Sequence, residues 1–209
     1  VNKALIIVNE SVNTINSTSL TINETTILNG TLIFNSTGGT KTLRDLLINT
    51  DGVWQCNVNE SFTIRGNIEN HGTMIPGTGT YTLNGANKII SGTATVTIGA
   101  ASITGSITNN NILTILGNTL GTGSLTNNTD SYLTIKGNTT ISTLNATANN
   151  NTVEYNSAGN QTIKGTSYHH LVISEAGTST INGITNINGT LTVLDGILAV
   201  NGFRSEEGR

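Results

Sequence analysis

The chain of 209 residues has one cysteine, one proline, one methionine and one tryptophan, and its aromatic content is 4%. Only 10% of its residues are charged, whereas an ordinary globular domain carries roughly 25%. A single cysteine excludes an internal disulfide framework and any cysteine-based zinc cluster. We expect Cys56 to be a small buried hydrophobic residue beside Trp54, with an intermolecular disulfide as the alternative.

Positive charge and long apolar runs are also scarce. No run of Lys or Arg occurs, and the net charge of -3 with a pI near 5.5 lacks the basic footprint of a nucleic-acid-binding protein. No apolar stretch approaches the roughly 18 residues that a membrane-spanning helix needs, and the longest compact run, Ala4 to Val8, has the length of a strand. We therefore expect neither a nucleic-acid partner nor a membrane span.

Small polar residues dominate instead. The chain has 31 Asn, 38 Thr and 16 Ser, and its aliphatic residues alternate with Thr in short units. An aliphatic-Thr-aliphatic unit is typical of a strand with one buried face. Units of this kind are Leu20-Thr21-Ile22, Leu113-Thr114-Ile115, Leu133-Thr134-Ile135 and Leu191-Thr192-Val193, and in the similar units Phe62-Thr63-Ile64, Tyr81-Thr82-Leu83 and Gln161-Thr162-Ile163 an aromatic residue or Gln takes the first position. No helical spacing is sustained, so the sequence predicts an all-β fold.

Glycine spacing distinguishes two all-β architectures. Bends of the type aliphatic-x-Gly recur at intervals near 19 residues, as from Gly66 to Gly85 and from Gly117 to Gly137. This period is typical of one turn of a three-sided solenoid. We predict a right-handed parallel β-helix (β-solenoid) with about 19 residues per turn, and the alternative is an antiparallel β-sandwich. The expected divisions are an N-terminal cap or assembly strand (1–18), the solenoid (19–202) and a charged tail or linker (203–209).

One phrase occurs twice, first as Phe34-Asn35-Ser36 leading to Gly38 and later as Tyr155-Asn156-Ser157 leading to Gly159. We expect both aromatic residues to pack in the core and both glycines to lie in bends. Together with Gln161-Thr162-Ile163, Tyr168-His169-His170-Leu171-Val172-Ile173 and Asn188-Gly189-Thr190-Leu191-Thr192-Val193, the second copy resembles a repeat module of secreted and cell-surface proteins of the Bacteroidetes type. Those proteins form filamentous-adhesin-like parallel β-helices. The resemblance covers Val153 to Gly202 and implies surface display without a particular catalytic activity.

Side chains suited to catalysis are sparse. The four Asp and eight Glu form no local pair of the kind that a glycosidase needs, apart from Glu206-Glu207 in the tail. Lys41, Arg44 and Asp45, near Asp51, form the densest charged neighbourhood, which we interpret as a solvated turn. We predict no catalytic residue, no cofactor and no metal site.

The sequence suggests one modification, N-glycosylation, and one kind of contact, self-association. Asn-x-Ser/Thr, the acceptor pattern for N-glycans, marks twelve possible sites. They are Asn9, Asn16, Asn23, Asn29, Asn35, Asn59, Asn127, Asn138, Asn145, Asn150, Asn160 and Asn188. The apolar strand Ala4, Leu5, Ile6, Ile7 and Val8 is the expected assembly strand, because unpaired strand edges recruit another chain.

These observations favour a non-enzymatic extracellular structural or adhesive protein at the cell surface, which self-associates end to end into a filament or sheath. The alternative is a β-helix that binds or degrades glycans, for which aromatic residues should line a groove. A minor alternative is an ice-binding protein, suggested by Thr93, Thr95 and Thr97.

Overall fold

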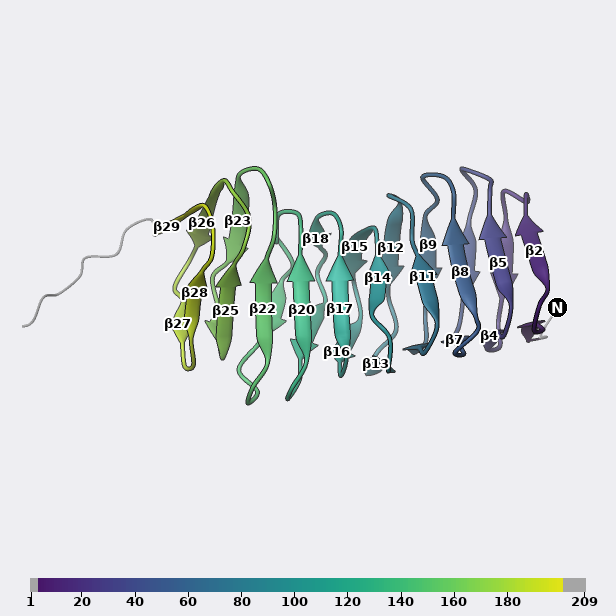
Figure 1. Cartoon of the computed structure of the whole chain (residues 1–209), viewed down its shortest axis with the longest axis horizontal. Helices are drawn as coiled ribbons and strands as arrows, with labels where there is room; N and C mark the ends of the chain where they lie inside the picture. The colour runs from purple at the N-terminus through teal and green to yellow at the C-terminus, as the bar shows by residue number, and fades with distance from the viewer. Residues whose placement is uncertain (1–3, 201–209) are drawn as a thin grey trace, which may run out of the picture.

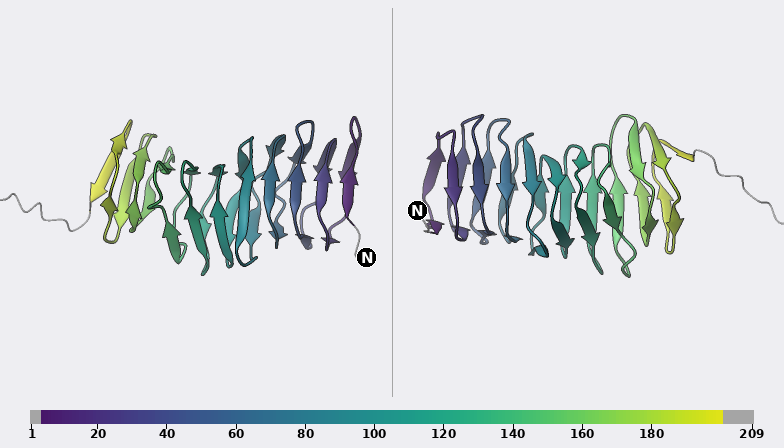
Figure 2. Two further views of the ribbon diagram at one scale, coloured as in Figure 1. Left: turned by 90° about the horizontal axis from the view of Figure 1, so that it is seen from below. Right: turned by 180° about the vertical axis from the view of Figure 1, so that it is seen from behind.

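The chain is a rod in which the backbone winds as a parallel β-solenoid of about ten coils with about 20 residues in each (Figure 1). The structure is a computed structural model that describes residues 4–200. The N-terminal coil lies at one end of the rod and the C-terminal coil at the other, and the views from below and behind show strands of successive coils side by side along the rod (Figure 2). No helix in residues 4–200 is long and apolar enough to cross a membrane.

The strands of successive coils lie on three faces, here called faces A, B and C, and the coil that holds β19 and β20 has only an isolated bridge at Thr139 on face C. Face A consists of β1 (Leu5–Ile7), β4 (Thr26–Leu28), β7 (Leu46–Ile48), β10 (Ile68–Asn70), β13 (Lys88–Gly92), β16 (Ser106–Asn109), β19 (Ser124–Asn127) and β21 (Thr143–Asn145), continued by β24 (Ser167–Tyr168) and β27 (Asn186–Ile187). Face B consists of β2 (Val12–Ile15), β5 (Thr31–Phe34), β8 (Val53–Cys56) and β11 (Thr73–Ile75), continued by β14 (Val96–Ile98), β17 (Ile112–Ile115), β20 (Tyr132–Ile135), β22 (Thr152–Tyr155), β25 (His170–Ile173) and β28 (Leu191–Val193). Face C consists of β3 (Leu20–Ile22), β6 (Lys41–Leu43), β9 (Phe62–Ile64), β12 (Thr80–Leu83), β15 (Ala100–Ile103) and β18 (Thr119–Leu120), continued by β23 (Gln161–Lys164), β26 (Thr178–Asn182) and β29 (Ile197–Val200).

Every strand pair in the sheets is parallel, so inward-facing residues stack on inward-facing residues of the next coil. Leu113 lies opposite Leu133, and Ile115 opposite Ile135, with all four side chains buried. The Thr between them points outward, since alternate residues of a strand face opposite sides. The parallel solenoid is therefore confirmed, and the antiparallel sandwich is not formed.

Residues 1–18, expected to form a cap or assembly strand, contribute β1 and β2 to the first coil. Leu5 pairs with Thr26 and Ile15 pairs with Phe34, and both strand pairs are parallel, as they are in later coils. The predicted charged tail, 203–209, lies outside the described residues.

An aromatic cluster fills the core of the first half of the rod. The ring of Trp54 lies 4.6 Å from that of Phe34 and 4.8 Å from that of Phe62, whose ring is 5.0 Å from that of Tyr81. The indole Nε1 donates to the Tyr81 hydroxyl at 3.1 Å, which satisfies a buried donor. Burial raises the pKa of Tyr81 well above its usual value. These residues come from three coils, so the cluster joins neighbouring coils through their side chains.

The repeated phrase plays the packing role expected of it. Phe34 and Tyr155 are completely buried, and Gly38 and Gly159 both lie in bends. Gly38 has a φ of 82°, in the left-handed region that favours glycine. At other corners the close approach of coils requires glycine: a Cβ on Gly99 would lie 2.1 Å from the carbonyl oxygen of Gly79.

Candidate assembly surfaces at the ends of the rod

The last coil exposes the side chains that the preceding coil buries. Leu171 is 0% exposed, whereas its register partner Leu191 is 45% exposed. Ile173 at 1% and Val193 at 45% differ in the same way. The cause is that β25 is covered by β28, whereas β28 is covered by no strand among residues 4–200.

The other two faces end similarly. On face C, Ile181 is 7% exposed and its partner Val200 is 46% exposed, while Leu198 is half-buried. On face A, Ile187 is half-buried beside the fully buried Tyr168. We call the inward-facing residues Ile187, Leu191, Val193, Leu198 and Val200 the C-terminal end surface. It is apolar throughout and bordered by strands whose outer edges are unpaired within residues 4–200.

The first coil forms the opposite end. Its inward-facing residues, here called the N-terminal end surface, are Leu5, Ile7, Asn13, Ile15, Leu20 and Ile22. Ile7 and Ile22 are buried, and Leu5, Ile15 and Leu20 are half-buried against the core. Asn13 is exposed at a position whose register partner is the buried Leu32. This end is therefore less apolar than the other.

The predicted assembly strand lies in this first coil. Leu5 to Ile7 form β1, which pairs with β4 on one side and with no described strand on the other. Ala4, Ile6 and Val8 are exposed. The sequence reasoning missed the C-terminal end surface, because Leu191-Thr192-Val193 has the same pattern as the buried units before it.

The possible glycosylation sites differ in accessibility. Asn127 is fully buried, and its amide donates to the carbonyl oxygens of Thr152 at 2.9 Å and Ser131 at 3.3 Å. A glycan on this nitrogen would break both bonds, so we expect none in the folded protein. Asn29 is half-buried and accepts a hydrogen bond from Asn49. The exposed sites are Asn9, Asn16, Asn23, Asn35, Asn59, Asn138, Asn145, Asn150, Asn160 and Asn188.

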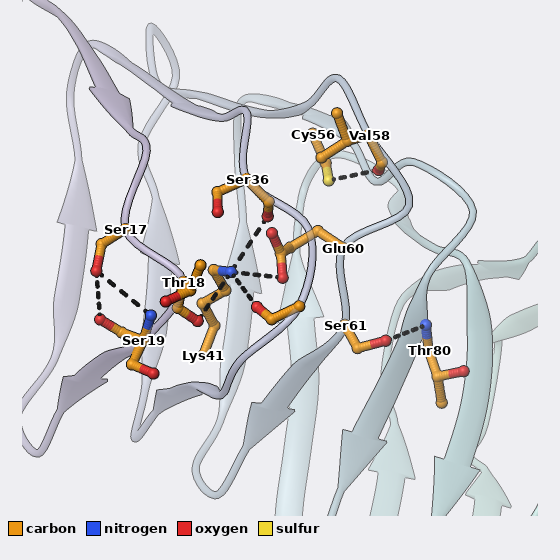
Figure 3. A network of polar contacts seen from close by, with 11 residues as sticks. Ser17, Thr18, Ser19, Ser36, Lys41, Cys56, Val58, Glu60, Ser61 and Thr80 are labelled. Atoms are coloured by element: carbon orange, nitrogen blue, oxygen red, sulfur yellow. Dashed lines mark hydrogen bonds and ion pairs between the residues drawn. The ribbon is translucent and has the colours of Figure 1, made fainter.

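The interpretation of Lys41, Arg44 and Asp45 as a solvated turn is wrong for Lys41. Its side chain is fully buried and forms a 2.7 Å ion pair with Glu60, which is also buried (Figure 3). The ammonium also donates to the carbonyl oxygens of Thr18, Ser36 and Gly38, at 3.2, 3.2 and 2.9 Å. Lys41 is drawn inward because residue 41 stands at an inward position of β6, opposite Leu20 and Phe62.

This pair holds three stacked corner loops together. Thr18, Ser36 and Glu60 belong to the connections that precede β3, β6 and β9. The second carboxylate oxygen of Glu60 has no hydrogen-bond partner among residues 4–200, so the ammonium is the principal stabilising group of this carboxylate. Arg44 stays at the surface as expected, where it contacts Glu24 at 3.2 Å and Asp45 at 3.3 Å. The ammonium is fully engaged, so it is not available as a catalytic group.

Glu154 is the centre of the other polar network, on the outward side of face B. It accepts hydrogen bonds from Ser174, from Asn156 at 3.0 Å and from Thr134 at 3.0 Å, and also from the Tyr132 hydroxyl. Burial alone would raise the pKa of this carboxyl, but the four hydrogen bonds outweigh it and lower the pKa. Burial and the neighbouring carboxylate raise the pKa of Tyr132 to about 12. Four donors saturate the carboxylate, which makes it a structural anion.

Other reactive groups are isolated or covered. Cys56 is buried and free, its Sγ lies 3.1 Å from the Val58 carbonyl oxygen, and burial raises the pKa of its thiol. His169 and His170 pack edge to face with ring centroids 4.4 Å apart, and the backbone amide of Thr190 donates to His170 Nδ1. Within residues 4–200 no three His, Cys, Asp or Glu side chains gather in a way that could hold a metal ion.

Comparison of the chain with protein-family models, with curated proteins and with solved structures returned no match. The functional assignment therefore depends on the geometry of the chain itself. The most informative feature is the C-terminal end surface, because apolar side chains that stand at core positions are exposed to solvent there.

Proposed function

We propose that this protein is a non-enzymatic extracellular structural or adhesive protein, a β-solenoid surface module whose copies assemble end to end into a filament or sheath. The observation that carries the proposal is the C-terminal end surface. Its apolar side chains occupy core positions, yet nearly half of the surface of Leu191, Val193 and Val200 is exposed. Covering them with another coil would remove apolar surface from water and pair the free strand edge.

The composition supports an extracellular location. Few residues are charged, Asn and Thr cover the outer faces, and ten possible glycosylation sites are exposed. The segment that resembles bacterial surface modules, Val153 to Gly202, includes the last coils of the rod. If the protein is displayed, antibodies against it should label intact cells of the source organism, and labelling only after permeabilisation would contradict this location.

The polar networks support a non-enzymatic role. Glu154 is saturated by donors and Glu60 is paired with Lys41, so neither carboxylate is placed to transfer a proton to a substrate. A groove with aromatic residues, which the glycan-binding alternative requires, finds little support. Of the aromatic residues within residues 4–200, only Tyr132 is partly exposed.

The ice-binding alternative also gains little. Thr97, Thr114 and Thr134 are in register on three successive strands of face B. A second row of hydroxyl groups would need Thr two residues earlier on each strand, but Ile112 precedes Thr114 and Tyr132 precedes Thr134 at that position, so the row is interrupted. Thermal hysteresis of the purified protein would test this alternative, and we expect none.

Sedimentation velocity over a range of protein concentrations tests the assembly. We expect the mean sedimentation coefficient to rise with concentration as rods join. The matched variants Val193→Lys and Thr192→Lys separate end contacts from side contacts, since residue 193 faces the end of the rod and residue 192 faces outward. Only Val193→Lys should remain monomeric; assembly that is lost equally in both variants would contradict an end-to-end contact.

A further inference from the structure

We propose that the two ends of the rod are complementary, so that the C-terminal coil of one copy receives the N-terminal coil of the next in parallel register. This inference rests on the proposed end-to-end assembly and adds its direction and its pairing. The contact joins two different surfaces and leaves one of each free. A contact of this kind does not close, so it generates an open filament.

The hydrogen-bonding direction of the strands supports this polarity. The carbonyl of Thr190 and the amide of Leu194 bond back to β25, so the amide and carbonyl groups of Leu191 and Val193 point away from the rod. At the other end, the carbonyls of Ser11 and Ile15 bond forward to β5, so the groups of Thr14 point away from the rod. Each free edge thus offers the donors and acceptors that one more parallel strand would take up.

The order of the strands around the coil also matches. β27, β28 and β29 lie on faces A, B and C, and β1, β2 and β3 lie on the same faces in the same order. Continuing the coil places β1 on β27, β2 on β28 and β3 on β29 of the neighbouring copy. A two-fold contact between two C-terminal coils would instead make antiparallel pairs and exchange two faces. If the exchanged faces were A and C, the two-residue β27 would lie against the four-residue β29.

The inward-facing side chains fit this pairing with one exception. Val193 would cover Ile15, Leu198 would cover Leu20, and Val200 would cover Ile22, so apolar residues would meet apolar residues at these three positions.

The exception is Asn13, which would meet Leu191. Its amide already donates to Ser11 Oγ at 3.2 Å, which limits the cost of covering it. One polar side chain at the centre of the contact weakens the association without preventing it.

Two variants that each block one end test the polarity. Thr14→Pro removes the outward-pointing amide of β2, because proline has no N–H to donate. It breaks no bond to β5, since the backbone groups of Thr14 point away from that strand. Val193→Lys places a charge on the C-terminal end surface. Thr14→Val and Thr192→Lys are the matched controls, which we expect to assemble as the wild type does. Circular dichroism and Trp54 fluorescence should confirm that each variant is folded.

Head-to-tail association predicts that each blocked variant is monomeric alone and that an equimolar mixture forms dimers and nothing larger, because one free end of each kind remains. Dimers of Thr14→Pro alone would show a contact between two C-terminal ends and overturn the proposed polarity, and dimers of Val193→Lys alone would do so for two N-terminal ends. Either result leaves end-to-end assembly intact. A wild-type protein that stays monomeric overturns the assembly itself.

A gain of affinity offers an independent check. Asn13→Leu replaces the polar side chain by the residue type found at the equivalent inward position of β5. We expect the association constant to increase on the order of tenfold. An unchanged or smaller constant would mean that residue 13 lies outside the contact, and would overturn the pairing of β2 with β28.

Discussion

Removing the ammonium of Lys41 should destabilise the rod more than any other single change at a charged residue. Lys41→Met replaces the alkyl part of the side chain but leaves Glu60 buried without its counter-charge, and three carbonyl oxygens without their donor. Breaking a buried ion pair by removing one partner costs about 3–5 kcal/mol. That is a large part of the roughly 5–15 kcal/mol by which a folded domain is stable.

The double variant Lys41→Met/Glu60→Leu separates the charge from the packing. With both charges gone, the remaining cost is that of carbonyl groups without donors, about 1–3 kcal/mol. The double variant should therefore be more stable than Lys41→Met alone. Arg44→Met is the surface control, because its exposed contact with Glu24 should contribute no more than about 1 kcal/mol.

Urea unfolding followed by the fluorescence of Trp54 measures these differences. Trp54 is the single tryptophan, it is completely buried, and its ring lies 4.8 Å from that of Phe62, two residues after Glu60. Far-UV circular dichroism in parallel shows whether the other coils unfold at the same urea concentration, since neighbouring coils stabilise one another. A cost below about 1 kcal/mol for Lys41→Met, or a double variant no more stable than the single, would refute a stabilising buried pair.

Three other perturbations have definite expected outcomes. The hydrogen bonds to Glu154 lower its pKa in the folded state, so the stability that the carboxylate contributes is complete above the ordinary carboxyl pKa of 4.5 and is lost as the pH falls through the folded pKa. The difference in melting temperature between wild type and Glu154→Gln should therefore shrink on acidification. A difference that stays constant would contradict a stabilising role for this hydrogen-bond network. Gly99→Ala should cost about 1–3 kcal/mol because its Cβ would meet the Gly79 carbonyl, whereas Gly159→Ala, which has open space around it, should be nearly neutral in the same urea titration. Expression in a host that adds N-glycans should leave Asn127 unmodified in peptide mass spectra of the folded protein, and a glycan there would place that residue at the surface.

The strand pattern and the coil were predictable because they depend on short-range signals. Alternation such as Leu133-Thr134-Ile135 indicates which side chains point inward, and glycine at regular intervals indicates where the chain bends. The period expected from glycine spacing, about 19 residues, is close to the observed value of about 20. These signals are repeated in most coils, so errors at single positions do not change the fold.

The burial of Lys41 and the exposure of Leu191 were not predictable in the same way. Lys41 stands near Arg44 and Asp45 in the sequence, but its partner Glu60 is 19 residues away and meets it only through the stacking of coils. Leu191 has the sequence surroundings of a core residue, and its exposure depends on the absence of a following coil among residues 4–200. Both properties belong to the contacts between coils.

Electron microscopy of the purified protein tests the central claim most directly, because it shows whether rods join at their ends. The account predicts filaments of constant width that lengthen with protein concentration, in which the strand spacing of roughly 4.8 Å along the axis continues across each junction. Val193→Lys should give only single rods under the same conditions. Single rods of the wild-type protein at every concentration, or rods joined side by side, would contradict the account.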